Sequence, residues 1–298
     1  MPAVSGLLKP CYVYAPRVLI RRIGLMFGDG AQSLRNVTPP WGTLLEINPD
    51  ETIGRELLRQ NIFDIGMSET AWRLLAPGAV AVDVGANIGY TTSLFAMRCG
   101  VRGAVEAFEP HPRIVERLKR NIAEIARASG AAPVRLHACA LGDREAVVQL
   151  LEPEAFGYNE GTARIGSEPS GASGFNVEMR RLDSSLGERH VTLLKVDVEG
   201  FEPEVIAGAE GLLARHAIDH IIYEAHDCER SPVHRMLERH GYSIFGIGHS
   251  LFGPRISPGT ARPAVDGAWE SPSYLATLRP AEALLTLRPR GWRVLAAS

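Results

Sequence analysis

Cysteine is scarce in this chain, with four residues among 298, and no two of them form a C-x-x-C pair. A thiolate zinc site needs closely spaced ligands, and a disulfide-stabilised secreted domain needs a dense cysteine framework. The sequence offers neither, so we expect reduced thiols and a cytoplasmic protein. The four cysteines are Cys11, Cys99, Cys139 and Cys228.

The chain also lacks an uninterrupted run of the roughly 18 to 20 apolar residues that a membrane helix requires. In residues 1–30, Arg17, Arg21 and Arg22 interrupt the apolar stretch, which is too short for a secretion signal. Such a segment can lie as an amphipathic helix at a membrane surface or pack as a cap on the core, and we favour the cap. We therefore predict no transmembrane segment.

Neither sign of charge is in clear excess. The chain has 32 Lys and Arg residues against 34 Asp and Glu, which gives a formal net charge of −2. Because no overall basic field attracts nucleic acid, we expect a small-molecule partner and no nucleic-acid binding. Hydrophobic residues make up 45% of the chain and charged residues 22%, which is typical of a globular protein with a substantial core.

The glycine pattern that binds a dinucleotide pyrophosphate is missing as well. Residues 81–92 form an apolar run that breaks into small residues, as in a nucleoside-binding loop, but the spacing is Gly85-x-x-x-Gly89 instead of G-x-G-x-x-G. Asn87 stands between the glycines at little steric cost, because Asn adopts left-handed backbone geometry more readily than most residues. Asp83 precedes the loop, where it would repel a phosphate but accept a cationic ligand. The pattern favours S-adenosylmethionine (SAM), a nucleoside with a sulfonium, an amino acid end and no phosphate.

Two further acids are candidates for contacts with the nucleoside. Glu109 closes a second apolar run about twenty residues after Gly89, where a carboxylate can accept hydrogen bonds from both ribose hydroxyls. Asp143 lies in the turn after a third apolar run and could accept a hydrogen bond from an adenine amino group. Each has a simpler alternative, because Glu109 can be an ordinary strand-end acid and Asp143 can cap its own turn. We favour the ligand role for both.

Apolar runs alternate with segments of helical character from residue 80 onward. This alternation indicates an α/β fold with a mostly parallel sheet and helices on both faces. The predicted strands are residues 80–84, 104–108, 134–140, 192–196 and 220–223, and the predicted helices are residues 89–98, 112–128, 203–215 and 231–240.

The chain divides into an N-terminal helical cap, residues 1–75, and a nucleoside-binding domain, residues 76–298. Two segments of the domain, near 152–176 and 246–273, are rich in small and polar residues and interrupt the alternation. We predict that each is an irregular insertion. A lid over the site and a plain surface loop both fit this composition.

The acceptor side of the site is predicted from two strand ends. Asp197 and Glu199 follow one apolar run, and Glu224 and His226 follow the next. Because the carboxyl ends of parallel strands meet at one edge of a sheet, these side chains are candidates for orienting or deprotonating an acceptor. Simpler alternatives are a helix N-terminal charge for Glu199 and a surface position for His226. A divalent cation could also lie here, but two carboxylates and a histidine do not identify one, so the metal stays unassigned.

The chain resembles the FkbM family of SAM-dependent methyltransferases over about residues 65–245. The resemblance rests on residues 82–91, on Phe108-Glu109-Pro110 with Asn121, on residues 140–143, and on Leu182-Asp183 leading to residues 195–202. It implies a Rossmann-like class I methyltransferase fold with a seven-stranded sheet and an antiparallel last hairpin. It also implies SAM as methyl donor, O-methylation of a hydroxyl on a sugar or natural product, and a SAM site lined by Asp83, Gly85, Asn87, Gly89 and Glu109.

Three other functions stay open at this point. N-methylation of a small-molecule amine would use the same carboxylates. An NAD-dependent oxidoreductase shares the fold but lacks its fingerprint here, and a catalytically silent SAM-fold protein would act as a partner subunit. A homodimer is also open, because Trp41 or Trp72, if exposed on the cap, would offer an apolar contact.

Overall fold

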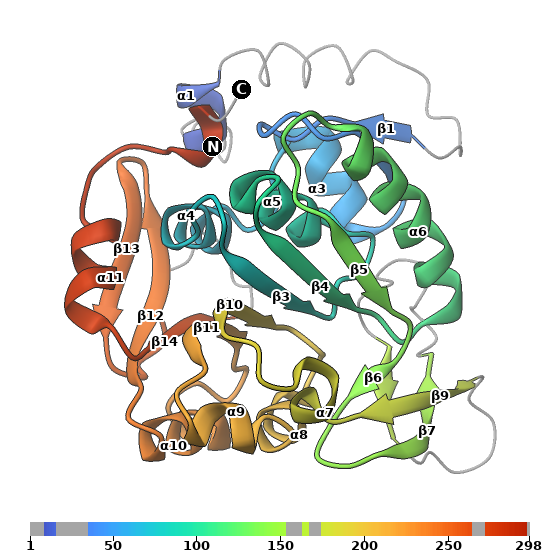
Figure 1. The fold of residues 1–298 in the computed structure, drawn as a ribbon. Helices are drawn as coiled ribbons and strands as arrows, with labels where there is room; N and C mark the ends of the chain where they lie inside the picture. Colours follow the sequence, from blue (N-terminus) through green and yellow to red (C-terminus); the bar gives the residue numbers. More distant parts are fainter. Residues whose placement is uncertain (1–8, 16–34, 153–162, 167–173, 264–271, 297–298) are drawn as a thin grey trace, which may run out of the picture.

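The computed structural model describes residues 9–15, 35–152, 163–166, 174–263 and 272–296. Within these residues one large mixed sheet runs through the molecule, with helices on both faces (Figure 1). In spatial order its strands are β13 (Gly253–Pro258), β12 (Ser243–Ser250), β14 (Ser273–Thr277), β11 (Ile218–Glu224), β10 (Val191–Val196), β3 (Val80–Val84), β4 (Ala104–Phe108) and β5 (Val134–His137). The last five run parallel to one another, and the first three join them in antiparallel pairs.

This architecture confirms the predicted Rossmann-like α/β fold. Seven of the strands form the expected sheet with its antiparallel last strands, and β13 adds an eighth at the edge. The third predicted strand is shorter than expected. β5 ends at His137, and Ala140–Leu141 form β6, which belongs to a separate sheet.

The helices cover the two faces in two groups (Figure 1). On one face lie α4 (Ile65–Leu74), α5 (Tyr90–Cys99) and α6 (Pro112–Arg127), and on the other lie α7 (Leu182–Leu186), α8 (Glu202–Ala207), α9 (Glu210–Ala214) and α10 (Pro232–Arg239). α6 shows why such segments are helical, because Ile114, Leu118 and Ile125 recur at helical spacing and are buried. Pro112 at its first turn and His111 at its N-cap fix where it begins.

Successive residues of each central strand enter different hydrophobic cores, as the two-residue period of a strand requires. In β10, Leu193 packs in the core that contains residues of α4 and α5, whereas Leu194 packs with residues of α8 and α10. In β11, Ile222 and Ile221 divide in the same way. Both faces of these two central strands are therefore covered by apolar side chains.

The first predicted insertion, near 152–176, lies next to a small second sheet. Its strands are β6, β9 (Gly174–Arg180), β7 (Ala146–Leu151) and β8 (Arg164–Ile165), in that spatial order. β8 and the first residues of β9 fall inside the segment, so its described part is strand instead of irregular loop. We call these four strands the accessory sheet. Residues 153–162 and 167–173 lie outside the described residues.

The second predicted insertion, 246–273, also differs from the expectation of an irregular segment. It begins inside β12 and continues through β13, and these two strands pair from Phe245 with Pro258 to Ser250 with Gly253. The hairpin forms because Ile244 and Ile247 bury apolar side chains against the sheet despite the neighbouring glycines. Residues 264–271 lie outside the described residues, so the lid hypothesis is not tested.

The N-terminal region combines strands with helices, where a helical cap was predicted. β1 (Arg35–Val37) and β2 (Leu45–Ile47) pair antiparallel, and α3 (Thr52–Gln60) leads to α4. A short helix, α1 (Pro10–Tyr14), contacts the turn η5 (Val294–Ala296) near the other end of the chain. Most of the expected helix within residues 1–30 falls outside the described residues.

The two tryptophans considered for a dimer contact are not exposed. Trp41 is buried, and its indole Nε1 donates a hydrogen bond to Ser93 Oγ at 2.9 Å. Trp72 is partly buried, and the Arg98 guanidinium lies 5.5 Å from its ring centroid. Trp41 therefore gives no apolar surface for a partner. Among the described residues, no helix is long and apolar enough to cross a membrane.

A buried ion pair ties α4 to the C-terminal segment. Glu69 and Arg73 lie one helical turn apart with fully buried side chains, and Arg73 Nε donates to Glu69 Oε1 at 2.5 Å. The Glu69 carboxylate also accepts hydrogen bonds from the backbone N–H groups of Arg293 and Val294. The Arg73 guanidinium donates to three carbonyl oxygens between residues 287 and 291.

Removing one partner of this pair should be costly, because it leaves the other charge buried without compensation. We expect Glu69→Ala to lower the free energy of unfolding in urea by about 3–5 kcal/mol. As a control, Glu116→Ala removes a surface acid that pairs with Lys119 and should leave the unfolding midpoint unchanged. Equal midpoints for the two variants would contradict this account of the pair.

Candidate functional site

A cavity of about 490 Å³ opens at the carboxyl ends of the central parallel strands. Its walls come from the loops after β3, β4, β10 and β11, from the start of α4, and from the accessory sheet. This is the edge at which ligands bind in open α/β sheets. Six of the ten predicted site residues line it, namely Gly85, Asn87, Glu109, Asp197, Glu199 and Glu224.

The loop after β3 is built from left-handed residues. Gly85 has φ +75°, and a Cβ there would lie 1.9 Å from the Asp197 carbonyl oxygen, so the position admits only glycine. Asn87 has φ +47°, and its side-chain Oδ1 accepts a hydrogen bond from Ile88 N–H at 2.6 Å. Gly89 does not line the cavity. It is the N-cap of α5, with φ +90°, and a Cβ there would lie 2.7 Å from Leu118 Cδ1.

Glu109 presents its carboxylate to the cavity from the end of β4. Its Oε2 accepts a hydrogen bond from Asn87 N–H and its Oε1 accepts one from His111 N–H, both at 2.9 Å. The side chain is buried, and burial raises the pKa of Glu109 to about 7, against the lowering effect of these two hydrogen bonds. The carboxylate is held in place, and its other lone pairs can accept two more donors.

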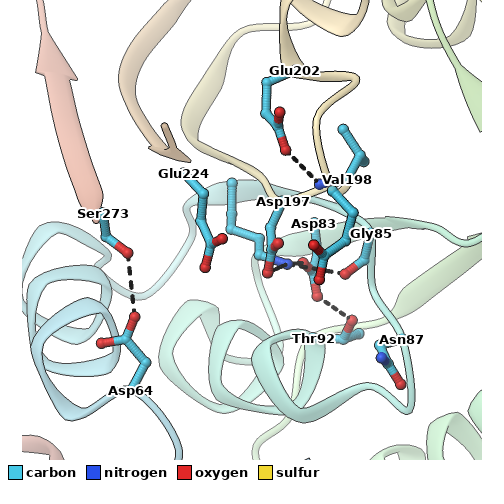
Figure 2. A network of polar contacts seen from close by, with 12 residues as sticks. Asp64, Asp83, Gly85, Asn87, Thr92, Asp197, Val198, Glu202, Glu224 and Ser273 are labelled. Carbon is cyan, nitrogen blue, oxygen red and sulfur yellow. Dashed lines mark hydrogen bonds and ion pairs between the residues drawn. The ribbon is translucent and has the colours of Figure 1, made fainter. Parts of the chain in front are cut away.

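A buried lysine joins the ends of β3 and β10. Lys195 Nζ lies 3.5 Å from Asp83 Oδ1 and 3.2 Å from Asp197 Oδ2, and it donates a hydrogen bond to the Gly85 carbonyl oxygen at 2.9 Å. Asp83 is fully buried and does not line the cavity, and its Oδ2 accepts a hydrogen bond from Thr92 Oγ1 at 2.6 Å (Figure 2). Asp83 therefore stabilises the loop from outside the cavity, through its contacts with Lys195 and Thr92.

Carboxylates gather on the other side of the cavity. Burial, followed by repulsion from Asp197, raises the pKa of Glu199 to about 7 and raises the pKa of Glu224 well above its ordinary value. Glu199 also has φ +55°, a strained conformation for this residue type. His226 lies at the rim with about half of its side chain exposed, and its Nε2 is 4.0 Å from a carboxylate oxygen of each glutamate.

The predictions from sequence missed an acid from the N-terminal region. Asp64 lines the cavity as the N-cap of α4, with φ +36°, and its Oδ1 accepts a hydrogen bond from Met67 N–H at 2.9 Å. Its Oδ2 accepts one from Ser273 Oγ at 3.3 Å, and Ser273 pairs with Glu224 across β14 and β11. Figure 2 shows Asp64 and Ser273 on one side of Glu224 and Asp197 on the other. An Asp before an apolar helix is an N-cap signal, but it does not predict a place in the site.

Asp143 stands apart from the cavity. Its carboxylate is partly exposed and pairs with Arg144 at 3.0 Å, and its carbonyl oxygen accepts a hydrogen bond from Arg181. The cavity wall is formed instead by the residues just before it, Cys139, Ala140 and Leu141. The adenine contact of Asp143 stays a prediction that this geometry does not favour.

The acids that the structure describes do not form a recognisable metal site. Among the residues that the structure describes, no group of three or more His, Cys, Asp or Glu side chains is arranged to hold a metal ion. The ammonium of Lys195 neutralises part of the acidic charge from within the cluster. No residue is therefore assigned to a metal.

The comparisons with known proteins point to one family. The family model described as "Methyltransferase FkbM domain" matches residues 83–244, more than half of the chain. The chain is 30% identical to the 31-O-demethyl-FK506 methyltransferase FkbM of Streptomyces tacrolimicus over 209 residues, 60% of this chain and 78% of that protein. It is 29% identical to Methyltransferase 1 of Beauveria bassiana over 189 residues, 55% of this chain and 72% of that protein.

Among solved structures, the methyltransferase FkbM of Methylobacillus flagellatus KT aligns with a TM-score of 0.46 and 17% sequence identity. The alignment covers 68% of this chain, which spans 47% of that solved chain. The sheet is Rossmann-like, and the family model that matches the chain is that of a methyltransferase domain. The chain belongs to the FkbM methyltransferase domain family.

The contact between Gly85 and Asp197 can be tested by adding a single methyl group. We expect Gly85→Ala to lower the free energy of unfolding by about 2 kcal/mol more than Gly130→Ala does. Gly130 is the matched control, because it has φ +90° but no atom lies within 4 Å of the place that a Cβ would take. The two variants share the conformational cost, so equal losses in urea unfolding would contradict a close contact at Gly85.

Proposed function

We propose that this protein transfers a methyl group from SAM to a hydroxyl of a small molecule, such as a sugar or a natural product. The observation that carries the proposal is the division of one cavity between two sets of acids. Glu109 lies alone on the side of β4, and Asp197, Glu199 and Glu224 lie together at the ends of β10 and β11. The name of the relative from Streptomyces tacrolimicus, a 31-O-demethyl-FK506 methyltransferase, supports an oxygen acceptor.

The residues of the cavity fit SAM. Glu109 would accept hydrogen bonds from the ribose hydroxyls, and the loop residues Gly85 and Asn87 line the cavity beside it. Apolar side chains such as Phe108, Ile114 and Leu141 line the cavity where an adenine ring would be buried. Among the described lining residues the basic side chain is Lys195, and because two acids pair with it, it is not available to a phosphate.

The acids near the transfer end would handle the acceptor proton. When bound, SAM supplies an activated methyl group, so the protein needs chiefly to hold the acceptor oxygen in line with it. Glu199 has a pKa of about 7, which suits a general base near neutral pH. Glu224 and Asp197 would orient the hydroxyl, and His226 at the rim, 4.0 Å from Glu199, would pass the proton to solvent.

An amine acceptor is the second candidate. Four carboxylates, of Asp64, Asp197, Glu199 and Glu224, line this part of the cavity, and an ammonium would be attracted to them. An ammonium must lose its proton before it can attack the methyl group, so the same general base would be needed. The identity of the product separates the two candidates.

Binding of S-adenosylhomocysteine (SAH), measured by calorimetry, tests the cofactor. We expect SAH to bind and NAD not to bind, and Glu109→Gln to weaken SAH binding by roughly 10- to 100-fold, because two hydrogen bonds to a charged acceptor are weakened. Ribose hydroxyls favour the ionised carboxylate, so affinity should rise with pH up to about 7, the pKa of Glu109. This rise should be smaller in Glu109→Gln. Binding of NAD without SAH would favour the oxidoreductase instead.

Incubating the protein with SAM and an extract of candidate glycosides tests the methyl transfer. Methylated products are detected by a mass gain of one methylene unit. We expect Glu199→Gln to lower turnover by about 100-fold near neutral pH and to remove the rise in rate through pH 7.

His226→Ala should lower turnover while SAH affinity stays nearly unchanged. Glu188→Gln, at a fully exposed acid outside the cavity, is the control. Unchanged turnover in His226→Ala would remove His226 from the mechanism, and SAH binding without any methylated product would favour the silent partner protein.

A further inference from the structure

A buried histidine lies between the acid that faces the ribose position and the accessory sheet. His111 follows Glu109 by two residues, and its backbone N–H donates a hydrogen bond to Glu109 Oε1 at 2.9 Å. Its imidazole is completely buried, and Nε2 lies 2.8 Å from Glu152 Oε1. One residue therefore contacts both the carboxylate in the cavity and a side chain of the neighbouring sheet.

Glu152 belongs to the segment that forms a wall of the same cavity. It comes directly after β7, whose Leu150 lines the cavity, and β8 adds Ile165 next to it. The accessory sheet has its own small core. The contact from His111 to Glu152 therefore links this wall of the cavity to Glu109.

The surroundings of His111 favour a directed hydrogen bond. His111 Nδ1 accepts from Ile114 N–H at 3.5 Å at the start of α6, which leaves Nε2 to carry the proton and donate to Glu152. Burial would raise the pKa of Glu152, but hydrogen bonds from His111 and Arg113 outweigh it and lower that pKa. The Phe175 ring of β9 packs edge-on against the imidazole at 5.1 Å. The side chains of His111 and Glu152 are thus both held in place by neighbouring residues.

We propose that His111 and Glu152 are a positioning pair that couples the two walls of the cofactor cavity. Through its backbone N–H, His111 orients Glu109, and through its imidazole it holds the accessory sheet, with Leu150 and Ile165, against the ligand. Neither side chain lines the cavity itself. The inference rests on the proposed function, because it takes SAM as the ligand.

A double-mutant cycle on SAH affinity tests the pair. His111→Asn keeps an N-cap side chain for α6 and shortens the reach to Glu152, and Glu152→Ala removes the acceptor. We expect each single variant to weaken SAH binding by roughly tenfold, and the double variant to bind no more weakly than the weaker single one. In Glu152→Gln the side-chain oxygen can still accept from Nε2–H, so most of the affinity should return.

Glu178→Ala is the matched control, because Glu178 lies on β9 of the same sheet, pairs with exposed Arg180 and does not line the cavity. It should leave SAH affinity unchanged. Additive losses in the cycle, or equal losses in Glu152→Gln and Glu152→Ala, would overturn the proposal. If His111→Asn does not fold, comparing the SAH affinities of Glu152→Gln and Glu152→Ala still tests the proposal. A wild-type protein that does not bind SAH would overturn the proposed function, and this inference with it.

Discussion

The site depends on one buried ammonium group. Lys195 lies on β10 beneath the cavity and joins Asp83 of β3 to Asp197 at the end of its own strand, while donating to the carbonyl oxygen of Gly85. A buried charge without partners is costly, so these four groups stabilise one another. The contact brings the backbone at Asp197 so close to Gly85 that a methyl group does not fit between them. The ends of β3 and β10 are thereby held together at the base of the cavity.

Three parts of the chain then complete the cavity around this base. The loop after β4 supplies Glu109, the N-terminal region supplies Asp64, and the accessory sheet supplies apolar side chains such as Leu150. Burial raises the pKa values of Glu109, Glu199, Glu224 and Asp64, and repulsion from Asp197 adds to the rise for the last three. Groups with raised pKa values cost stability when they ionise, and a ligand that favours their charged forms recovers part of that cost.

The sequence predicted the parts of the site that short patterns encode. An apolar run that ends at an acid and breaks into small residues predicted the loop from Gly85 to Asn87. Acids at the ends of predicted strands predicted that Glu109, Asp197, Glu199 and Glu224 belong to the site. Asp64 and Ser273 were missed because they reach the cavity through contacts across 209 residues of sequence, which no local pattern reports. Strand pairing also explains β13 and the accessory sheet, because β13 joins β12 in a hairpin and β7 pairs with β9, which the composition of these segments does not reveal. Trp41 was a candidate for the surface because its local sequence does not reveal the hydrogen bond to Ser93 that accompanies its burial.

The central claim is that one end of a SAM-like nucleoside lies on Glu109 and its reactive end lies among the acids after β10 and β11. A crystal structure of the complex with SAH tests this most directly. The account predicts both ribose hydroxyls within hydrogen-bonding distance of the Glu109 carboxylate, and the sulfur atom on the side of Asp197 and Glu224. A ligand bound with its ribose away from Glu109, or outside this cavity, would contradict the account.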